Sequence, residues 1–182
     1  MRVLKPHLKW FILPAIALLH VGTGGRLLDC AFYPTPYFTF EIDLTRDLTI
    51  GLAIGLVYVG ISRWLVHSTR WGKALEDELL GLLRNRERSP LSDAISSSIL
   101  EECVFRGLLL NYVSLWLGAA IFALFHLPTQ RDLILWMLSA FAMGLVFGVL
   151  FLSGFSLLAP LSAHFIINYL NLHYLNRRQP AL

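Results

Sequence analysis

Three charged residues, Glu101, Glu102 and Arg106, stand inside an apolar stretch from Pro90 to Val113. A charged side chain at the centre of a bilayer costs at least about 2.5 to 3.5 kcal/mol, so it usually has a partner and often a function. Glu102 and Arg106 are four residues apart, share one face of a helix and can form an ion pair. Glu101 is rotated about 100° away from Glu102, so it should face a different neighbour.

Two histidines further along the chain are candidates for that neighbour. His126 follows Phe122 by four residues and His164 precedes Asn168 by four, so each pair lines one face of its helix. At 1.5 Å of rise per residue, Glu101 and His164 lie at comparable depths, about 17 and 20 Å from the ends of their helices. We therefore expect these two side chains to meet. His126 fits less well, because only about 8 Å of helix separates it from the next basic residue.

These residue types can together hydrolyse an amide bond. Glu101 could act as general base toward a water that His126 helps to hold. His164 and Asn168 could donate hydrogen bonds to the oxyanion of the tetrahedral intermediate. Glu101, His126 and His164 could also supply the three protein ligands of a catalytic zinc site, although the HExxH spacing of zinc proteases is absent. We expect the reaction to need no metal or other cofactor.

The composition indicates that the helices carrying these residues lie in a membrane. Of 182 residues, 56% are hydrophobic and 15% are charged, and the mean hydropathy is +0.62, whereas soluble domains have about 25% charged residues. About six apolar stretches predict an all-α, multi-pass transmembrane helical bundle that forms one domain, residues 1–182. The stretches are Leu8 to Gly24, Leu48 to Val66, Pro90 to Val113, Leu115 to Leu127, Leu133 to Ser153 and Phe155 to Leu175. Because so little helix separates His126 from the next basic residue, either residues 127–130 dip into the membrane or the site lies nearer the cytoplasm than these stretches suggest.

The basic residues predict how the chain is oriented. Only Arg26 and Arg46 fall on the side opposite the N-terminus, and one further arginine lies within a span, so both termini should be cytoplasmic. The first apolar stretch could be a cleaved signal peptide or a retained signal anchor, and we expect the anchor. Residues 71–83 have apolar and charged side chains at helical spacing, which predicts either an amphipathic helix on the cytoplasmic surface or a solvated connector. The basic residues form no continuous patch, so we expect no nucleic-acid partner.

Several small or reactive residues near the motifs have simpler explanations. Ser96 to Ser98 could include a nucleophile, but small hydroxyl residues at a close helix contact explain them better. Gly144, Gly148 and Gly154 resemble the small residues of packed membrane helices. Cys103 is expected to be a packing residue, although its place among the motif residues leaves a thiol role open.

The charged and histidine motifs resemble those of a known family, the CAAX protease and bacteriocin-processing family of intramembrane endopeptidases. Its signatures are EExxxR, FxxxH and HxxxN/D, and the type II CAAX prenyl endopeptidases belong to it. The matching residues here are Glu101, Glu102, Arg106, Phe122, His126, His164 and Asn168. Three motifs in this order are much more specific than one alone. The resemblance covers about residues 89–176, the expected catalytic core, and implies the division of labour given above, with Glu102, Arg106 and Phe122 as supports.

The residues and the resemblance predict an intramembrane endopeptidase, of the glutamic rather than the metalloprotease type. Its partners would be the lipid bilayer and a membrane-associated protein or peptide substrate, and we expect a bacterial plasma membrane location. One alternative is a non-enzymatic immunity or scaffold protein that retains the protease fold. Another is a proton or metal carrier, which should show an internal repeat that this sequence lacks.

Overall fold

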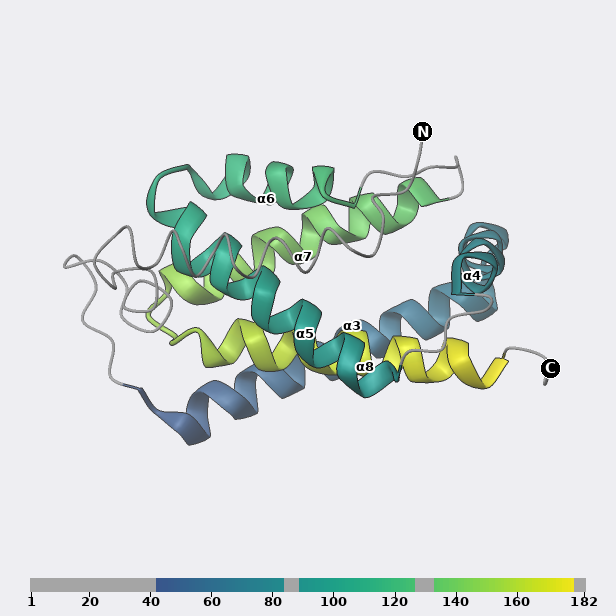
Figure 1. Ribbon diagram of the computed structural model, residues 1–182, viewed down its shortest axis with the longest axis horizontal. Coiled ribbons are helices and arrows are strands. Elements are labelled where there is room, and N and C mark those ends of the chain that lie inside the picture. Colours follow the sequence, from purple (N-terminus) through teal and green to yellow (C-terminus); the bar gives the residue numbers. More distant parts are fainter. Residues whose placement is uncertain (1–41, 84–88, 127–132, 179–182) are drawn as a thin grey trace.

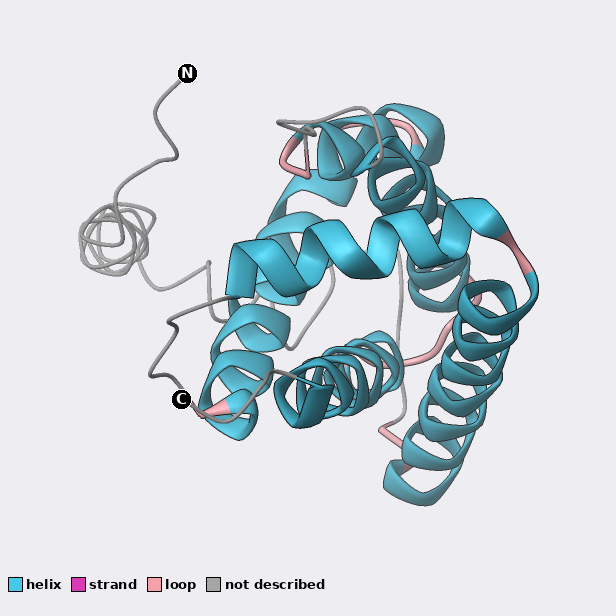
Figure 2. Ribbon diagram, turned by 90° about the vertical axis from the view of Figure 1, so that its right-hand side faces the viewer, coloured by secondary structure: helices cyan, strands magenta, loops and turns pink. Residues whose placement is uncertain are grey.

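The described part of the chain is built from helices. The computed structural model describes residues 42–83, 89–126 and 133–178, in which no strand occurs (Figures 1 and 2). The α-helices are α3 (Leu44–Ser68), α4 (Arg70–Leu83), α5 (Pro90–Glu102), α6 (Leu115–Leu124), α7 (Ile134–Leu152) and α8 (Leu158–Arg178). A π-helix, η1 (Cys103–Leu108), and a 3₁₀ turn, η2 (Leu109–Asn111), connect α5 to α6. The predicted all-α fold is confirmed for these residues.

Two of these helices are long and apolar enough to cross a membrane. They are α3 and α7, and α6 is a shorter apolar helix. The expected first span, Leu8 to Gly24, and residues 127–130 lie outside the described residues. The six-span bundle therefore stays a prediction. The described residues do contain two helices whose length and apolar composition would allow them to span a membrane.

The structure differs from the sequence prediction in two helices, and both differences lie next to charged residues. The stretch from Pro90 to Val113 is not one α-helix, because its backbone changes to a π-helix directly after Glu102. The second apolar helix begins at Leu44 rather than Leu48. It therefore includes Asp47, whose buried carboxylate accepts a hydrogen bond of 3.0 Å from the backbone N–H of Ser156. The Asp47 side chain thus has a partner inside the bundle, which lets the helix start before it.

Helix α8 lies between α3 and α5, and α6 packs along α7 (Figure 1). The contact of α3 with α8 is close because α3 presents two glycines. A Cβ atom added to Gly51 would lie 2.3 Å from the carbonyl oxygen of Ala159, and one added to Gly55 would lie 2.9 Å from that of Ala163. Small residues on both helices thus let the backbones approach, as in other membrane helix pairs.

Two apolar clusters flank the polar residues of the motifs. Phe147 of α7 is the centre of one, with residues of α8 and partly buried side chains of α3. Phe105, Phe122 and Ala140 form the other, between η1, α6 and α7. The ring of His164 contacts both clusters, with centroids 5.5 Å from Phe147 and 6.1 Å from Phe122. The apolar packing therefore fixes where this histidine lies.

Candidate active site

The two glutamates at the end of α5 have different environments, as their positions on the helix predict. Glu102 is fully buried and accepts a hydrogen bond of 2.9 Å from Nη1 of Arg106. The predicted ion pair is thus present. Nη2 of Arg106 donates to the carbonyl oxygen of Gly144 at 3.4 Å, and the guanidinium lies 4.6 Å from the centroid of the Phe122 ring. Arg106 therefore links η1 to α6 and α7.

Glu101 faces the two motif histidines. Its Oε2 atom lies 3.8 Å from Nε2 of His126 and 3.7 Å from Nε2 of His164. This oxygen is buried and makes no hydrogen bond, although the Glu101 side chain as a whole is 26% exposed. The separations are longer than a direct hydrogen bond of about 2.7 to 3.2 Å. One water could, however, bridge the carboxylate and an imidazole.

Each histidine is oriented by a partner on its other ring nitrogen. Nδ1 of His126 lies 2.9 Å from the carbonyl oxygen of Phe122, and Nδ1 of His164 lies 2.7 Å from Oε1 of Glu102. Because a carbonyl oxygen and an ionised carboxylate only accept hydrogen bonds, both Nδ1 atoms carry the proton. Both rings therefore present Nε2 to Glu101.

Asn168 lies on the same face of α8 as His164, one turn further along. Its Nδ2 atom donates to Oγ of Ser97 at 2.9 Å. Ser97 in turn is one turn before Glu101 on α5. The predicted site residues Glu101, His126, His164 and Asn168 are thus gathered where α5 meets α8 and the end of α6.

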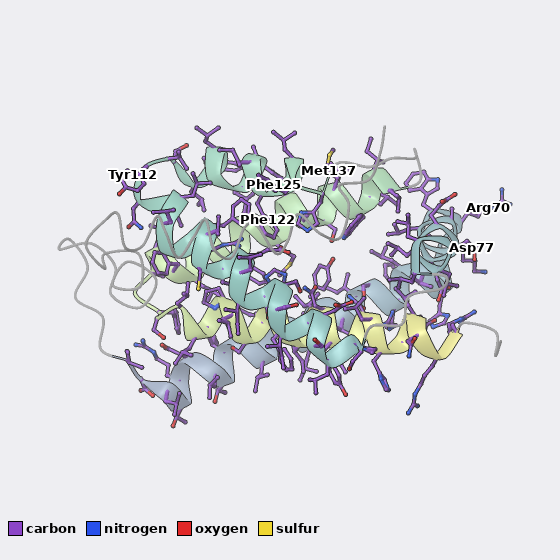
Figure 3. The ribbon with its side chains drawn as sticks, viewed as in Figure 1. Arg70, Asp77, Tyr112, Phe122, Phe125 and Met137 are labelled. Carbon is purple, nitrogen blue, oxygen red and sulfur yellow. The ribbon has the colours of Figure 1, made fainter. Side chains whose placement is uncertain are left out.

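Phe122 packs against the imidazole of His126, with ring centroids 4.9 Å apart. Figure 3 labels it together with Phe125, which follows directly after α6. Phe122 is 3% exposed and Phe125 is 76% exposed, so the motif phenylalanine is the one that points into the bundle. Phe122 also supplies the carbonyl oxygen that orients His126, and it therefore contacts the site through both its ring and its backbone.

Residues 90–170 match a family model described as Rce1-like, type II CAAX prenyl endopeptidase. This part of the chain belongs to the CAAX protease family. The matched segment contains all of the motif residues. Comparisons with curated proteins and with solved structures find no match. Since CAAX proteases are membrane-embedded endopeptidases, the family supports an enzyme of the protease class, and the apolar helices are compatible with a place in the membrane.

Some contacts of the candidate site were not predicted from the sequence. Trp136 of α7 contacts the His126 ring edge-on, with centroids 5.3 Å apart, and Phe147 packs against His164. Ser97 lies at a helix contact, as expected of a small hydroxyl residue, but its hydrogen bond with Asn168 was not predicted. Nothing in the sequence separates these aromatic residues from other apolar core residues. The spacing of Ser97 and Glu101, one turn apart, is a signal that could have identified the serine.

Glu101, His126 and His164, which could supply the ligands of a zinc site, lie close together in the structure. Among the residues that the structure describes, no three His, Cys, Asp or Glu side chains are placed to hold a metal ion. Tetrahedral zinc, with bonds of about 2.0 to 2.2 Å, would bring its ligand atoms to about 3.4 Å from one another. The separations of 3.7 and 3.8 Å at Glu101 are wider than this.

Proposed function

We propose that the chain is a glutamic-type intramembrane endopeptidase that hydrolyses a peptide bond of a membrane-associated protein or peptide. One observation carries the proposal: a buried carboxylate oxygen of Glu101, without a hydrogen bond, lies between Nε2 of His126 and Nε2 of His164. The family match, described as a type II CAAX prenyl endopeptidase, supports the protease class.

The first step needs a water that loses a proton as it attacks the peptide carbonyl. Neutral His126 can only accept a hydrogen bond at Nε2, because its proton is on Nδ1. A water between Glu101 and His126 can therefore donate one hydrogen to each and direct a lone pair at the substrate. Glu101 takes the proton during the attack and returns it to the leaving amine.

The tetrahedral intermediate then carries a negative charge on the former carbonyl oxygen. His164 can donate to this oxyanion through Nε2 only when both ring nitrogens are protonated, because Nδ1 already donates to Glu102. Asn168 can contribute a second N–H donor.

Glu102, Arg106 and Phe122 support the reacting groups without contacting the substrate. Glu102 holds the His164 ring, and Arg106 holds Glu102. Phe122 contacts both the Arg106 guanidinium and the His126 ring. We expect changes at these positions to act through the orientation of Glu101 and the two histidines.

For the placement in the membrane we propose cytoplasmic termini, a bacterial plasma membrane location and a position of α4 at the cytoplasmic surface. The exposed side chains of α4 support this position: Trp71 is 74% exposed beside the exposed residue Lys73. An exposed tryptophan next to basic side chains is typical of a helix at a membrane interface.

The proposal is tested by terminal-peptide mass spectrometry of membranes and medium from native cells. Cells would express wild type, Glu101→Gln or Asp77→Asn at matched protein levels; Asp77 is an exposed acidic residue of α4 and serves as the control (Figure 3). We expect a specific set of cleaved termini to disappear in Glu101→Gln alone. If that variant yields the same termini as wild type with an intact phenotype, the chain is instead a non-enzymatic membrane protein that keeps the protease fold.

A further inference from the structure

We infer that Ser97 is a positioning residue that holds the side-chain amide of Asn168 in the orientation needed for oxyanion binding. The inference rests on the proposed function, because it assigns a support to one of the groups proposed to bind the oxyanion. Its starting point is the hydrogen bond of 2.9 Å from Nδ2 of Asn168 to Oγ of Ser97, which joins α8 to α5.

Oγ of Ser97 can act only as a hydrogen-bond acceptor toward Asn168, because its own proton is already donated. The single hydroxyl proton of Ser97 is donated to the carbonyl oxygen of Asp93, at 2.7 Å. Oγ can therefore only accept from the asparagine side chain. If the amide flipped, Oδ1 would face Oγ, and the serine would have to give up its bond to Asp93 to avoid two opposed acceptors. Ser97 thus selects the orientation in which the NH₂ group of Asn168 points to α5.

The bond lies next to the reacting groups. Glu101 and His164 form one contact between α5 and α8, and Ser97 and Asn168 form a second contact one turn away, about 6 Å along the helices. An amide nitrogen has two hydrogens, and Ser97 accepts only one of them. The other remains to donate to an oxyanion formed beside Glu101.

Neighbouring serines do not share this arrangement. Ser96 is exposed and its hydroxyl donates to the Asp93 carbonyl oxygen at 3.3 Å. Ser98 is buried and donates to the carbonyl oxygen of Ala94 at 2.6 Å. Of these three serines, Ser97 is the one to which Asn168 donates its hydrogen bond. Ser96→Ala is therefore a matched control for Ser97→Ala, with the same chemical change one position away.

The test measures kcat and KM of the full-length protein in lipid vesicles. The probe is an internally quenched peptide that spans the cut site lost in Glu101→Gln cells. We expect Ser97→Ala to lower kcat about ten-fold with KM within about two-fold, because a donor used only in the transition state would be misoriented. Ser97→Thr, which keeps the hydroxyl, and Ser96→Ala should stay within about two-fold of wild type. Asn168→Ala should lower kcat about 100-fold, the scale of a lost oxyanion donor.

The double variant separates positioning from a general effect on packing. If Ser97 acts through Asn168, adding Ser97→Ala to Asn168→Ala should cause no further loss of kcat. The inference would be overturned if the kcat losses of Ser97→Ala and Asn168→Ala multiply in the double variant, or if Ser97→Ala has a wild-type kcat. Either result, together with an inactive Glu101→Gln, would leave the proposed function in place. Cleavage that survives in Glu101→Gln would instead contradict the proposed function itself. Thermal unfolding of each purified variant shows whether the compared proteins are folded, and Ser97→Thr gives a second comparison if Ser97→Ala is not.

Discussion

At the scale of single residues, one oxygen of Glu102 holds two neighbours. Oε1 accepts from Nη1 of Arg106 at 2.9 Å and from Nδ1 of His164 at 2.7 Å. Burying a carboxylate costs free energy unless charged and hydrogen-bonding partners replace water. The buried Glu102 carboxylate therefore depends on Arg106 for its stability. The same carboxylate also orients the His164 ring.

We predict that Arg106→Met destabilises the protein by about 3 to 5 kcal/mol, because it leaves the buried Glu102 carboxylate without its cation. The measurement is thermal unfolding in detergent, compared with Arg177→Met at an exposed position. Adding Glu102→Gln should restore much of the stability without restoring cleavage, since the His164 partner is altered. Equal stability of Arg106→Met and Arg177→Met would show that the ion pair contributes nothing to the fold.

Metal removal gives a second prediction at this scale. If Glu101 acts as a general base on a water, dialysis against a strong zinc chelator should leave the cleavage rate unchanged, and the purified protein should hold far less than one zinc per chain. The measurements are cleavage kinetics and metal analysis on the same sample. Activity that is lost on chelation and regained with zinc would favour Glu101, His126 and His164 as metal ligands instead.

At the scale of the helices, the sequence predicted where most of the helices lie. It did not predict the π-helix that follows Glu102 or the close contact between α3 and α8. The apolar stretches correctly located α3, α7 and α8, because long apolar runs are a strong signal. The π-helix after Glu102 was missed, because a segment of six residues is too short to show a hydrophobic period different from that of the α-helix before it. π-helical segments are frequent at functional sites, and this one carries Arg106.

The close contact of α3 with α8 was also missed, although its glycines are visible in the sequence. We predict that Gly51→Ala destabilises the protein by about 1 to 3 kcal/mol, because the new Cβ would lie 2.0 Å from Oγ of Ser162 and 2.3 Å from the carbonyl oxygen of Ala159. Gly60→Ala is the control on the same helix, since a Cβ there meets no atom within 4 Å. Thermal unfolding of both variants would measure the difference, and equal melting temperatures would contradict the close packing.

At the scale of the whole molecule, composition predicted a membrane protein and the motifs predicted its family. The candidate site residues Glu101, His126, His164 and Asn168 could be selected from the sequence because they are polar groups within apolar segments, where a polar side chain usually has a partner or a function. Their catalytic roles stay predictions. The supporting contacts of Phe147 and Trp136 could not be predicted, because aromatic residues are common in apolar helices. Orientation in the membrane follows only from the distribution of basic residues and can be measured.

We predict that the two ends of α3 lie on opposite sides of the membrane. In a background with Cys30→Ser and Cys103→Ser, Thr45→Cys should react with a membrane-impermeant maleimide added to intact cells. Lys73→Cys on α4, which is also exposed, should react only after the cells are permeabilised. The reverse labelling pattern would place the termini outside the cytoplasm and contradict the orientation proposed from the basic residues.

The most direct test of the central claim is the cleavage rate of purified Glu101→Gln in lipid vesicles. The substrate would be the quenched peptide from the cellular cut site, with Asp77→Asn as the control. We predict a loss of about 10² to 10⁴-fold in kcat for Glu101→Gln, the usual contribution of a general base, with unchanged thermal stability and a wild-type rate for Asp77→Asn. A wild-type rate for Glu101→Gln would show that the carboxylate between the two histidines does not activate the water.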